Sequence, residues 1–311
     1  MALAEFDLIK RYFSNQTPRH PFVRLGIGDD CALLQIPPEL QLAVTTDTMV
    51  ENVHFFAGTD AQQLGHKLLT VNLSDLAAMG AEPFAVTLAI TMPGIDENWL
   101  AAFSLGFLNL ARRHNVDLIG GDTTAGPLTF TVQAMGTLPA GAALLRSTAK
   151  AGDLIYLTGP IGNAGLGLKI HQGYPCPNPA PMLTSFNFPQ PRIAQGLALR
   201  NLASACIDVS DGLAADLGHI LEKSGVGACL HWDNLPLSAE VQDYIKSGGD
   251  WRLPLMAGDD YELCFTAPPG IEQQLPADCY CIGTIETEAG LRIIRNGQLQ
   301  TLEAKGFEHF S

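Results

Sequence analysis

The chain has 311 residues and a formal net charge of −14, with 18 Lys and Arg against 32 Asp and Glu. This acidic balance argues against nucleic acid as a partner, because nucleic-acid binding draws much of its affinity from a basic surface. The length favours two domains, and the absence of any run of about 18 apolar residues predicts no membrane span.

The first half of the chain predicts alternating helices and strands. Apolar residues at helical spacing predict helices at 4–14, 61–79 and 96–114, with Asp96 as the N-cap of the third. Strands are predicted at 32–34, 40–46, 84–91, 116–119 and 128–135, the first of them buried. The opening residues lack a basic segment followed by an apolar one, so no signal peptide is expected.

The second half begins after a stretch rich in small residues, and we place the domain boundary between residues 140 and 141. The expected domains are therefore 1–140 and 141–311. Strands are predicted at 154–158, 205–209, 227–232, 279–285 and 291–294, and a turn leads into a strand over 257–266. Helices are predicted at 192–204, 213–224 and 238–246, and the proline-rich segment 173–191 is interpreted as a long loop or lid. This mixture favours an α+β fold.

The 7 cysteines are scattered and form no paired CxxC zinc pattern. They are interpreted as reduced thiols of a protein located in the cytoplasm.

Acidic residues recur beside Gly, Ser or Thr, at what the pattern predicts to be the ends of helices and strands. The set comprises Asp29 and Asp30 in GIGDD, Asp47, Asp75, Asp122, Asp208 and Asp211 in DVSDG, and Asp259 and Asp260. Each of them alone has an ordinary explanation as a turn former or helix cap. Together they form a set of carboxylates without neighbouring Lys or Arg, which is typical of a site for hard divalent cations such as Mg²⁺.

Other catalytic patterns are missing from the sequence. The phosphate-binding loop GxxxxGK[ST], the GxSxG elbow, HExxH and the protein-kinase motifs are all absent. Arg146 lies in a region poor in positive charge, where it is explained equally well as a surface residue or as a phosphate contact.

Seven segments, in this order and spacing, resemble the thiamine-monophosphate kinase family. They are GIGDDCALL, TTDTMVENVHF, NLSDLAAMGAEP, LIGGDTT, LLRSTAKAGDLIYLTG, IDVSDG and AGDDYELCFT. This family belongs to the ATP-binding superfamily that includes aminoimidazole ribonucleotide synthetase and selenophosphate synthetase. The resemblance implies two α+β domains, with the N-terminal sheets of two subunits pairing across a homodimer. It also implies transfer of the γ-phosphoryl group of ATP to thiamine monophosphate, directly and in line, with several Mg²⁺ ions.

The resemblance implies the following site residues. Mg²⁺ would be held by Asp30, Thr45, Thr46, Asp47, Asp75, Asp122, Asp208 and Asp211. ATP would be bound by Gly121, Asp122, Arg146 and Ser210, and thiamine monophosphate by His54, Asp259 and Phe307. No covalent nucleophile is expected, because phosphoryl transfer depends mainly on positioning and charge neutralisation.

Two departures from the family pattern concern the ligands. Asp259 stands where many relatives carry the longer Glu, and Leu105 stands where some place an aromatic residue near the adenine. Two alternatives remain open at this stage: another ATP-dependent synthetase of the same superfamily, or a nucleotide-binding relative without catalysis.

Overall fold

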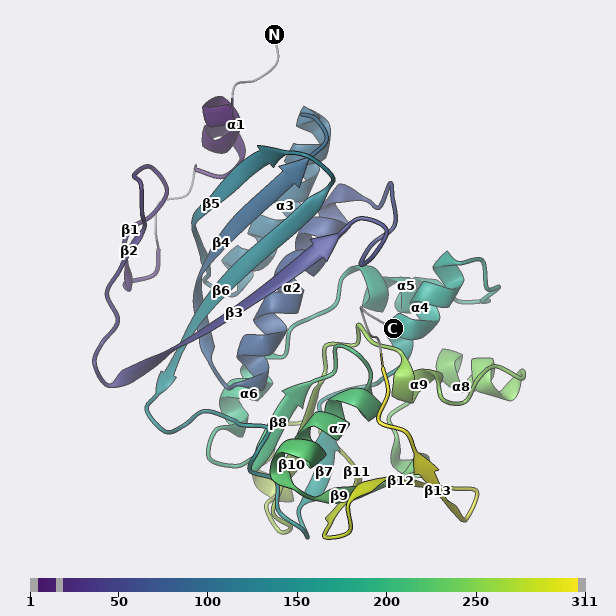
Figure 1. Cartoon of the computed structure of the whole chain (residues 1–311). Helices are drawn as coiled ribbons and strands as arrows, with labels where there is room; N and C mark the ends of the chain where they lie inside the picture. Colours follow the sequence, from purple (N-terminus) through teal and green to yellow (C-terminus); the bar gives the residue numbers. More distant parts are fainter. Residues whose placement is uncertain (1–4, 15–18, 307–311) are drawn as a thin grey trace. The chain divides into compact units, whose positions relative to one another are not determined.

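The computed structural model describes residues 5–14 and 19–306, and the chain forms two compact units (Figure 1). Unit 1 comprises Met1–Leu76 and Ala81–Gly141, and unit 2 comprises Ala77–Gly80 and Ala142–Ser311. Most strand pairs in both units are antiparallel, and helices pack on the sheets, so the α+β prediction is confirmed. Among the described residues, no helix is both long and apolar enough to cross a bilayer.

Unit 1 is built on a four-stranded sheet in the order β3-β6-β4-β5. Its elements are α1 (Glu5–Tyr12), β1 (Val23–Leu25), β2 (Leu33–Leu34), β3 (Leu40–Val50), α2 (Ala61–Ala78), β4 (Glu82–Met92), α3 (Glu97–Arg113), β5 (Asp117–Ala125) and β6 (Thr129–Pro139). Helices α2 and α3 lie together against one face of this sheet in Figure 1. Helix α3 begins where the sequence predicts, because the Asp96 side chain accepts hydrogen bonds from the backbone of Asn98 and Trp99.

Two expectations for unit 1 are wrong. Strand β2 has only two residues, and Leu33 is 56% exposed, so residues 32–34 do not form the buried strand that was expected. Asp47 and Asp122 also do not follow strands. Each lies within one, because β3 continues to Val50 and β5 continues through the Gly-Gly-Asp segment to Ala125. The polar and glycine residues look like strand ends, but the cross-strand ladder continues through them.

Unit 2 is built on a seven-stranded sheet in the order β13-β12-β9-β11-β7-β10-β8. Its strands are β7 (Leu154–Leu157), β8 (Ala205–Asp208), β9 (Gly227–His231), β10 (Leu263–Ala267), β11 (Tyr280–Glu286), β12 (Gly290–Arg295) and β13 (Gln298–Leu302). Its helices are α4 (Asn163–His171), α5 (Ala180–Asn187), α6 (Ile193–Leu199), α7 (Leu213–Ser224), α8 (Ala239–Lys246) and α9 (Leu253–Met256), with short 3₁₀ turns at Trp232–Asn234 and Glu272–Gln274. The apolar side of α7 packs into the main core of the unit through Leu213, Leu217 and Ile220.

Three features of unit 2 differ from expectation. The proline-rich segment 173–191 contains helix α5, because Pro181 occupies the start of a helix, where the missing amide hydrogen costs nothing. Strand β13 extends the sheet beyond the last predicted strand, and the short helix α9 was not predicted. The predicted N-cap Ser238 is confirmed, since its side chain accepts a hydrogen bond from the Val241 amide.

Candidate functional site

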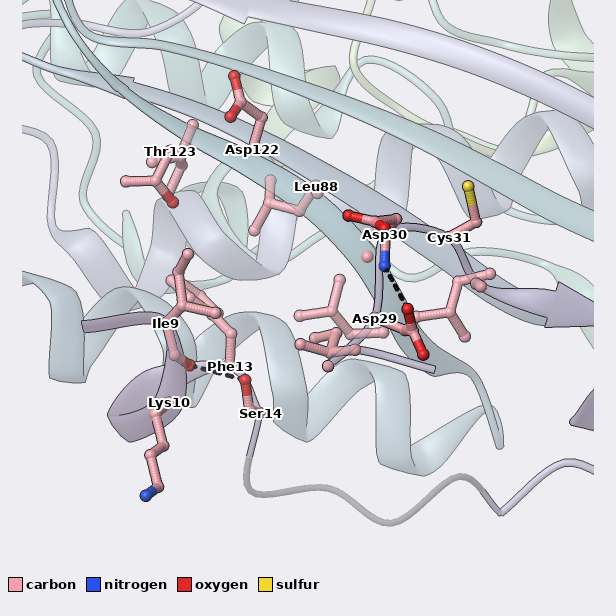
Figure 2. A pocket seen from close by; sticks show the side chains of 18 residues that line it. Ile9, Lys10, Phe13, Ser14, Asp29, Asp30, Cys31, Leu88, Asp122 and Thr123 are labelled. Atoms are coloured by element: carbon pink, nitrogen blue, oxygen red, sulfur yellow. Dashed lines mark hydrogen bonds between the residues drawn. The ribbon is translucent and has the colours of Figure 1, made fainter. Parts of the chain in front are cut away.

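Unit 1 contains a pocket of about 810 Å³ between α1, the Gly28–Ala32 turn and the edge strand β5. Its apolar wall includes Ile9 from α1 and Phe13 from the turn that follows it, and in Figure 2 these side chains face the sheet while Lys10 extends away from it. Asp30 and Asp122 line the same pocket, from segments more than 90 residues apart in the sequence. The volume lies within the range of small-molecule sites.

Three carboxylates line this pocket, and two of them, those of Asp30 and Asp122, fit a hard cation. Within the described ranges, neither Asp30 nor Asp122 forms an ion pair with Lys or Arg, and both residues are exposed. The turn is held by the Asp29 side chain, which accepts a hydrogen bond of 2.9 Å from the Asp30 amide (Figure 2). Oxygen donors without a local countercharge are what Mg²⁺ prefers.

Gly121 is required by the sheet itself. A Cβ at this position would lie 1.9 Å from the carbonyl oxygen of Leu88 on the neighbouring strand β4. The family resemblance assigns Gly121 to the ATP site. The structure adds a second reason for glycine, which is the close approach of β4 and β5.

The predicted ligands of β3 are divided between its two faces. The hydroxyl of Thr45 donates a hydrogen bond to the carboxylate of Asp75, which projects from α2. Asp47 shares this face with Thr45, because side chains alternate along a strand, whereas the side chain of Thr46 points to the opposite face and is exposed. Asn72, one helical turn before Asp75, has a buried side-chain oxygen without a hydrogen-bond partner among the described residues.

His54 lies in the turn after β3, where its ring is oriented by the backbone. The Val50 amide donates to Nδ1 at 3.0 Å, so the neutral ring carries its proton on Nε2. This arrangement makes Nε2 a hydrogen-bond donor, which suits contact with a phosphate oxygen.

Unit 2 presents Asp208 as the last residue of β8, and Ser210 and Asp211 in the turn between β8 and α7. Helix α7 has no side-chain N-cap, and Asp216, one turn into the helix, accepts hydrogen bonds of 3.0–3.1 Å from the amides of Ser210, Asp211 and Gly212. Burial, followed by the charges of Asp208 and Asp211, raises the pKa of Asp216 to about 8, despite the backbone donors that lower it.

The segment that carries Asp259 lies beside this turn. The Asp259 amide donates to the carbonyl of Ser210 at 2.8 Å, and its carboxylate accepts a hydrogen bond from the Tyr261 hydroxyl, also at 2.8 Å. Unit 2 therefore brings together Ser210, Asp211 and Asp259, which sequence reasoning assigned to ATP, metal and substrate.

Two further predicted residues belong to unit 2, and the structure describes only one of them. Arg146 is exposed, and its own carbonyl accepts a hydrogen bond from Ser224. Phe307 lies outside the described residues.

The structure adds functional candidates that sequence reasoning missed. Ile9 and Phe13 line the pocket of unit 1, and Asp216 holds a turn by its amides. Asp260 belongs to the acidic set named above, but its hydrogen bonds to backbone amides were not predicted. The sequence did carry a signal for Asp216. This acidic residue lies in the first turn of a helix that has no capping side chain, a position where a carboxylate can accept hydrogen bonds from free amides.

Within residues 5–14 and 19–306, no group of three or more His, Cys, Asp and Glu side chains is arranged to hold a metal ion. The eight predicted ligands divide between the units, with six in unit 1 and Asp208 and Asp211 in unit 2.

Comparison with known families gives two matches. Residues 28–138 match the AIR synthase related protein, N-terminal domain, and residues 150–272 match the AIR synthase related protein, C-terminal domain.

Individual relatives point to one enzyme. The chain is 46% identical to the thiamine-monophosphate kinase of Salmonella typhimurium and 44% identical to that of Escherichia coli, covering 100% of this chain and 99% of each relative. The crystal structure of thiamine-monophosphate kinase from Stenotrophomonas maltophilia superposes with a TM-score of 0.85 at 42% identity, covering 96% of this chain and 98% of that one. A structure described as AaThiL complexed with AMPPCP and TMP has a TM-score of 0.79 at 27% identity, covering 89% of each chain.

Proposed function

Since the chain belongs to the thiamine-monophosphate kinase family of AIR synthase-related proteins, we propose that it transfers the γ-phosphoryl group of ATP to the phosphate of thiamine monophosphate in one in-line step. Full-length similarity to thiamine-monophosphate kinases supports the kinase activity, and the in-line step is our proposal. The relative described with AMPPCP and TMP supports a nucleotide and a thiamine phosphate as the two ligands. The acceptor is already an ionised phosphate, so the reaction needs alignment of two anions more than a strong base.

The pocket of unit 1 is proposed as part of the nucleotide site. Its apolar wall at Ile9 and Phe13 excludes water from a bound ligand, and its acidic side carries Asp30 and Asp122. Gly121 adjoins this acidic side, and Arg146 and Ser210 of unit 2 are proposed as further contacts to ATP.

Magnesium fits the oxygen donors of the site. We propose that it is held by Asp30, Thr45, Thr46, Asp47, Asp75, Asp122, Asp208 and Asp211. Thr46 would contribute a main-chain oxygen, because its side chain points to the opposite face of β3. When bound, the ions neutralise the charge between two anionic reactants. The Thr45 hydroxyl orients the Asp75 carboxylate, and the Val50 amide keeps His54 in the tautomer that donates from Nε2.

Asp259 and Phe307 are proposed to contact the thiamine moiety. A carboxylate can pair with the positive thiazolium ring or accept from the aminopyrimidine, and an aromatic ring can stack on either. The Tyr261 hydroxyl orients the Asp259 carboxylate for this contact.

The reaction is tested by a coupled assay with ATP, Mg²⁺ and thiamine monophosphate. We expect ADP and thiamine diphosphate to form in equal amounts, because one phosphoryl group moves per turnover. Unphosphorylated thiamine is the matched acceptor, and we expect no product from it. Turnover with thiamine alone would contradict the proposed acceptor. A protein that retains label from γ-labelled ATP would contradict direct transfer.

A homodimer is supported by the outer face of β3. Leu42 and Val44 occupy alternate positions on this edge strand and are 46% and 51% exposed, on the face opposite the Thr45–Asp75 contact. Apolar side chains on an edge strand are commonly covered by another chain. The seven free cysteines support a reducing compartment such as the cytoplasm for this enzyme.

Val44→Lys is expected to shift the protein from dimer to monomer, because a charge would replace an apolar side chain at the proposed interface. Light scattering coupled to size exclusion measures the change. Leu299→Lys is the matched control, since Leu299 is 62% exposed on β13 of unit 2. A wild-type protein that is already monomeric at micromolar concentration would contradict the proposal.

A further inference from the structure

The segment Gly258–Tyr261 has an unusual backbone. Asp259 and Tyr261 both have positive φ, at 69° and 50°, and neither is glycine. Residues other than glycine seldom adopt this left-handed region, and such residues persist only where the surrounding structure fixes them. Asp260 lies between these two residues, and its side-chain hydrogen bonds anchor the segment.

The Asp260 side chain is bound to the start of α4. Its Oδ2 accepts a hydrogen bond from the Gly162 amide at 2.7 Å, and its Oδ1 accepts from the Ala164 amide at 3.2 Å. Gly162 is the N-cap residue of α4 and provides no side-chain cap, so Asp260 caps this helix from a distant segment. Desolvation raises the pKa of Asp260 to about 8, against the lowering effect of the two amides. Burying the Asp260 carboxylate at this position therefore costs desolvation free energy.

The other side of the segment is bound to the turn after β8. The Asp259 amide donates to the Ser210 carbonyl, and the Tyr261 amide donates to the Val209 carbonyl at 2.9 Å. A Cβ at Gly258 would lie 2.1 Å from the Ser210 carbonyl oxygen, so the two backbones touch. The segment thus has one anchor on α4 and another on the turn that carries Ser210 and Asp211.

We propose that Asp260 is a positioning residue for substrate binding, which acts through Asp259. By occupying the amides of Gly162 and Ala164, its carboxylate forces left-handed backbone on both sides. That backbone brings the Tyr261 hydroxyl to the Asp259 carboxylate and fixes the direction of the latter. The inference rests on the proposed contact between Asp259 and thiamine monophosphate, and it adds Asp260 and Tyr261 to that contact.

The test compares KM for thiamine monophosphate with KM for ATP in the full-length enzyme. Asp260→Ala removes both acceptors, and we expect KM for thiamine monophosphate to rise about 10- to 100-fold, because two hydrogen bonds that fix the segment are lost. Asp260→Asn keeps one acceptor and should be intermediate. Tyr261→Phe removes only the hydroxyl and should raise the same KM by about 2- to 10-fold. KM for ATP should change less than KM for thiamine monophosphate in all three.

Controls separate positioning from general stability. Asp243→Asn removes an exposed carboxylate of α8 in the same unit, and we expect both KM values to stay at those of the wild type. A double mutant of Asp259→Asn with Asp260→Ala should bind thiamine monophosphate no more weakly than the worse single variant, because both changes remove one interaction. Urea unfolding of each variant shows whether it is folded under assay conditions.

The outcomes are distinguishable. If Asp259→Asn leaves KM for thiamine monophosphate unchanged, the proposed substrate contact is wrong. If Asp259→Asn raises this KM but Tyr261→Phe and Asp260→Asn do not, the substrate contact stands and the positioning role is overturned. A lower unfolding midpoint with both KM values unchanged would also overturn it, because it would leave Asp260 with a structural role alone.

Discussion

Asp122→Asn is expected to lower kcat by about 10²- to 10³-fold, the usual effect of removing one group that stabilises charge in the transition state. The substitution keeps the size and shape of the side chain but removes its charge. Asp122 is exposed on β5 beside the pocket and forms no ion pair within the described ranges, so the fold should not depend on it. The coupled assay with thiamine monophosphate measures the loss.

Glu39→Gln is the matched control for this experiment. It removes one negative charge from an exposed position of the same unit, outside the residues that line the pocket. We expect its kcat to equal that of the wild type. The Mg²⁺ concentration needed for half-maximal activity should rise in Asp122→Asn and not in the control. If kcat of Asp122→Asn stays within a factor of three of the wild type, Asp122 does not belong to the site.

Local signals explain which elements could be predicted from the sequence. Helices α3 and α8 begin at Asp96 and Ser238, whose side chains cap them, and capping depends on residues only two or three positions away. Strand β5 was predicted too short because its continuation through Gly121 and Asp122 depends on pairing with β4, more than 30 residues earlier. Pairing partners at this distance leave no local pattern.

The candidate site shows the same difference between features with a local sequence signal and features that depend on distant contacts. The acidic segments themselves were recognisable, because their order and spacing resemble those of a known family. Asp216 and the role of Asp260 were missed, because both side chains bind backbone amides, and any segment of the chain offers amides. The predicted strand 40–46 already places Thr45 and Thr46 on opposite faces, whereas Asp47 joins the face of Thr45 only because β3 continues to Val50. Sequence spacing indicates which residues carry the chemistry, whereas contacts between distant segments determine how they are presented.

The packing of α2 on α3 is expected to make Gly106→Ala strongly destabilising. A Cβ at Gly106 would lie 2.0 Å from the backbone oxygen of Gln62, and one at Gly65 would lie 2.2 Å from that of Phe103. Glycine within a helix costs about 1 kcal/mol relative to alanine, so alanine would otherwise stabilise both helices. Because the obstructing atoms are backbone, the helices must separate, and we expect a net loss of about 1–3 kcal/mol in the free energy of unfolding.

Urea unfolding of Gly106→Ala and of Gly94→Ala measures this effect. Gly94 lies in the same unit, has no positive φ, and has no heavy atom within 4 Å of the position of an added Cβ. Alanine there should leave stability unchanged or slightly raised. Separation of α2 from α3 should also disturb the Asp75 carboxylate, since α2 carries it to Thr45, so activity should fall in Gly106→Ala under conditions where the protein is folded. Equal stability of the two variants would contradict the prediction, because it would mean that the space between α2 and α3 accommodates a methyl group at Gly106.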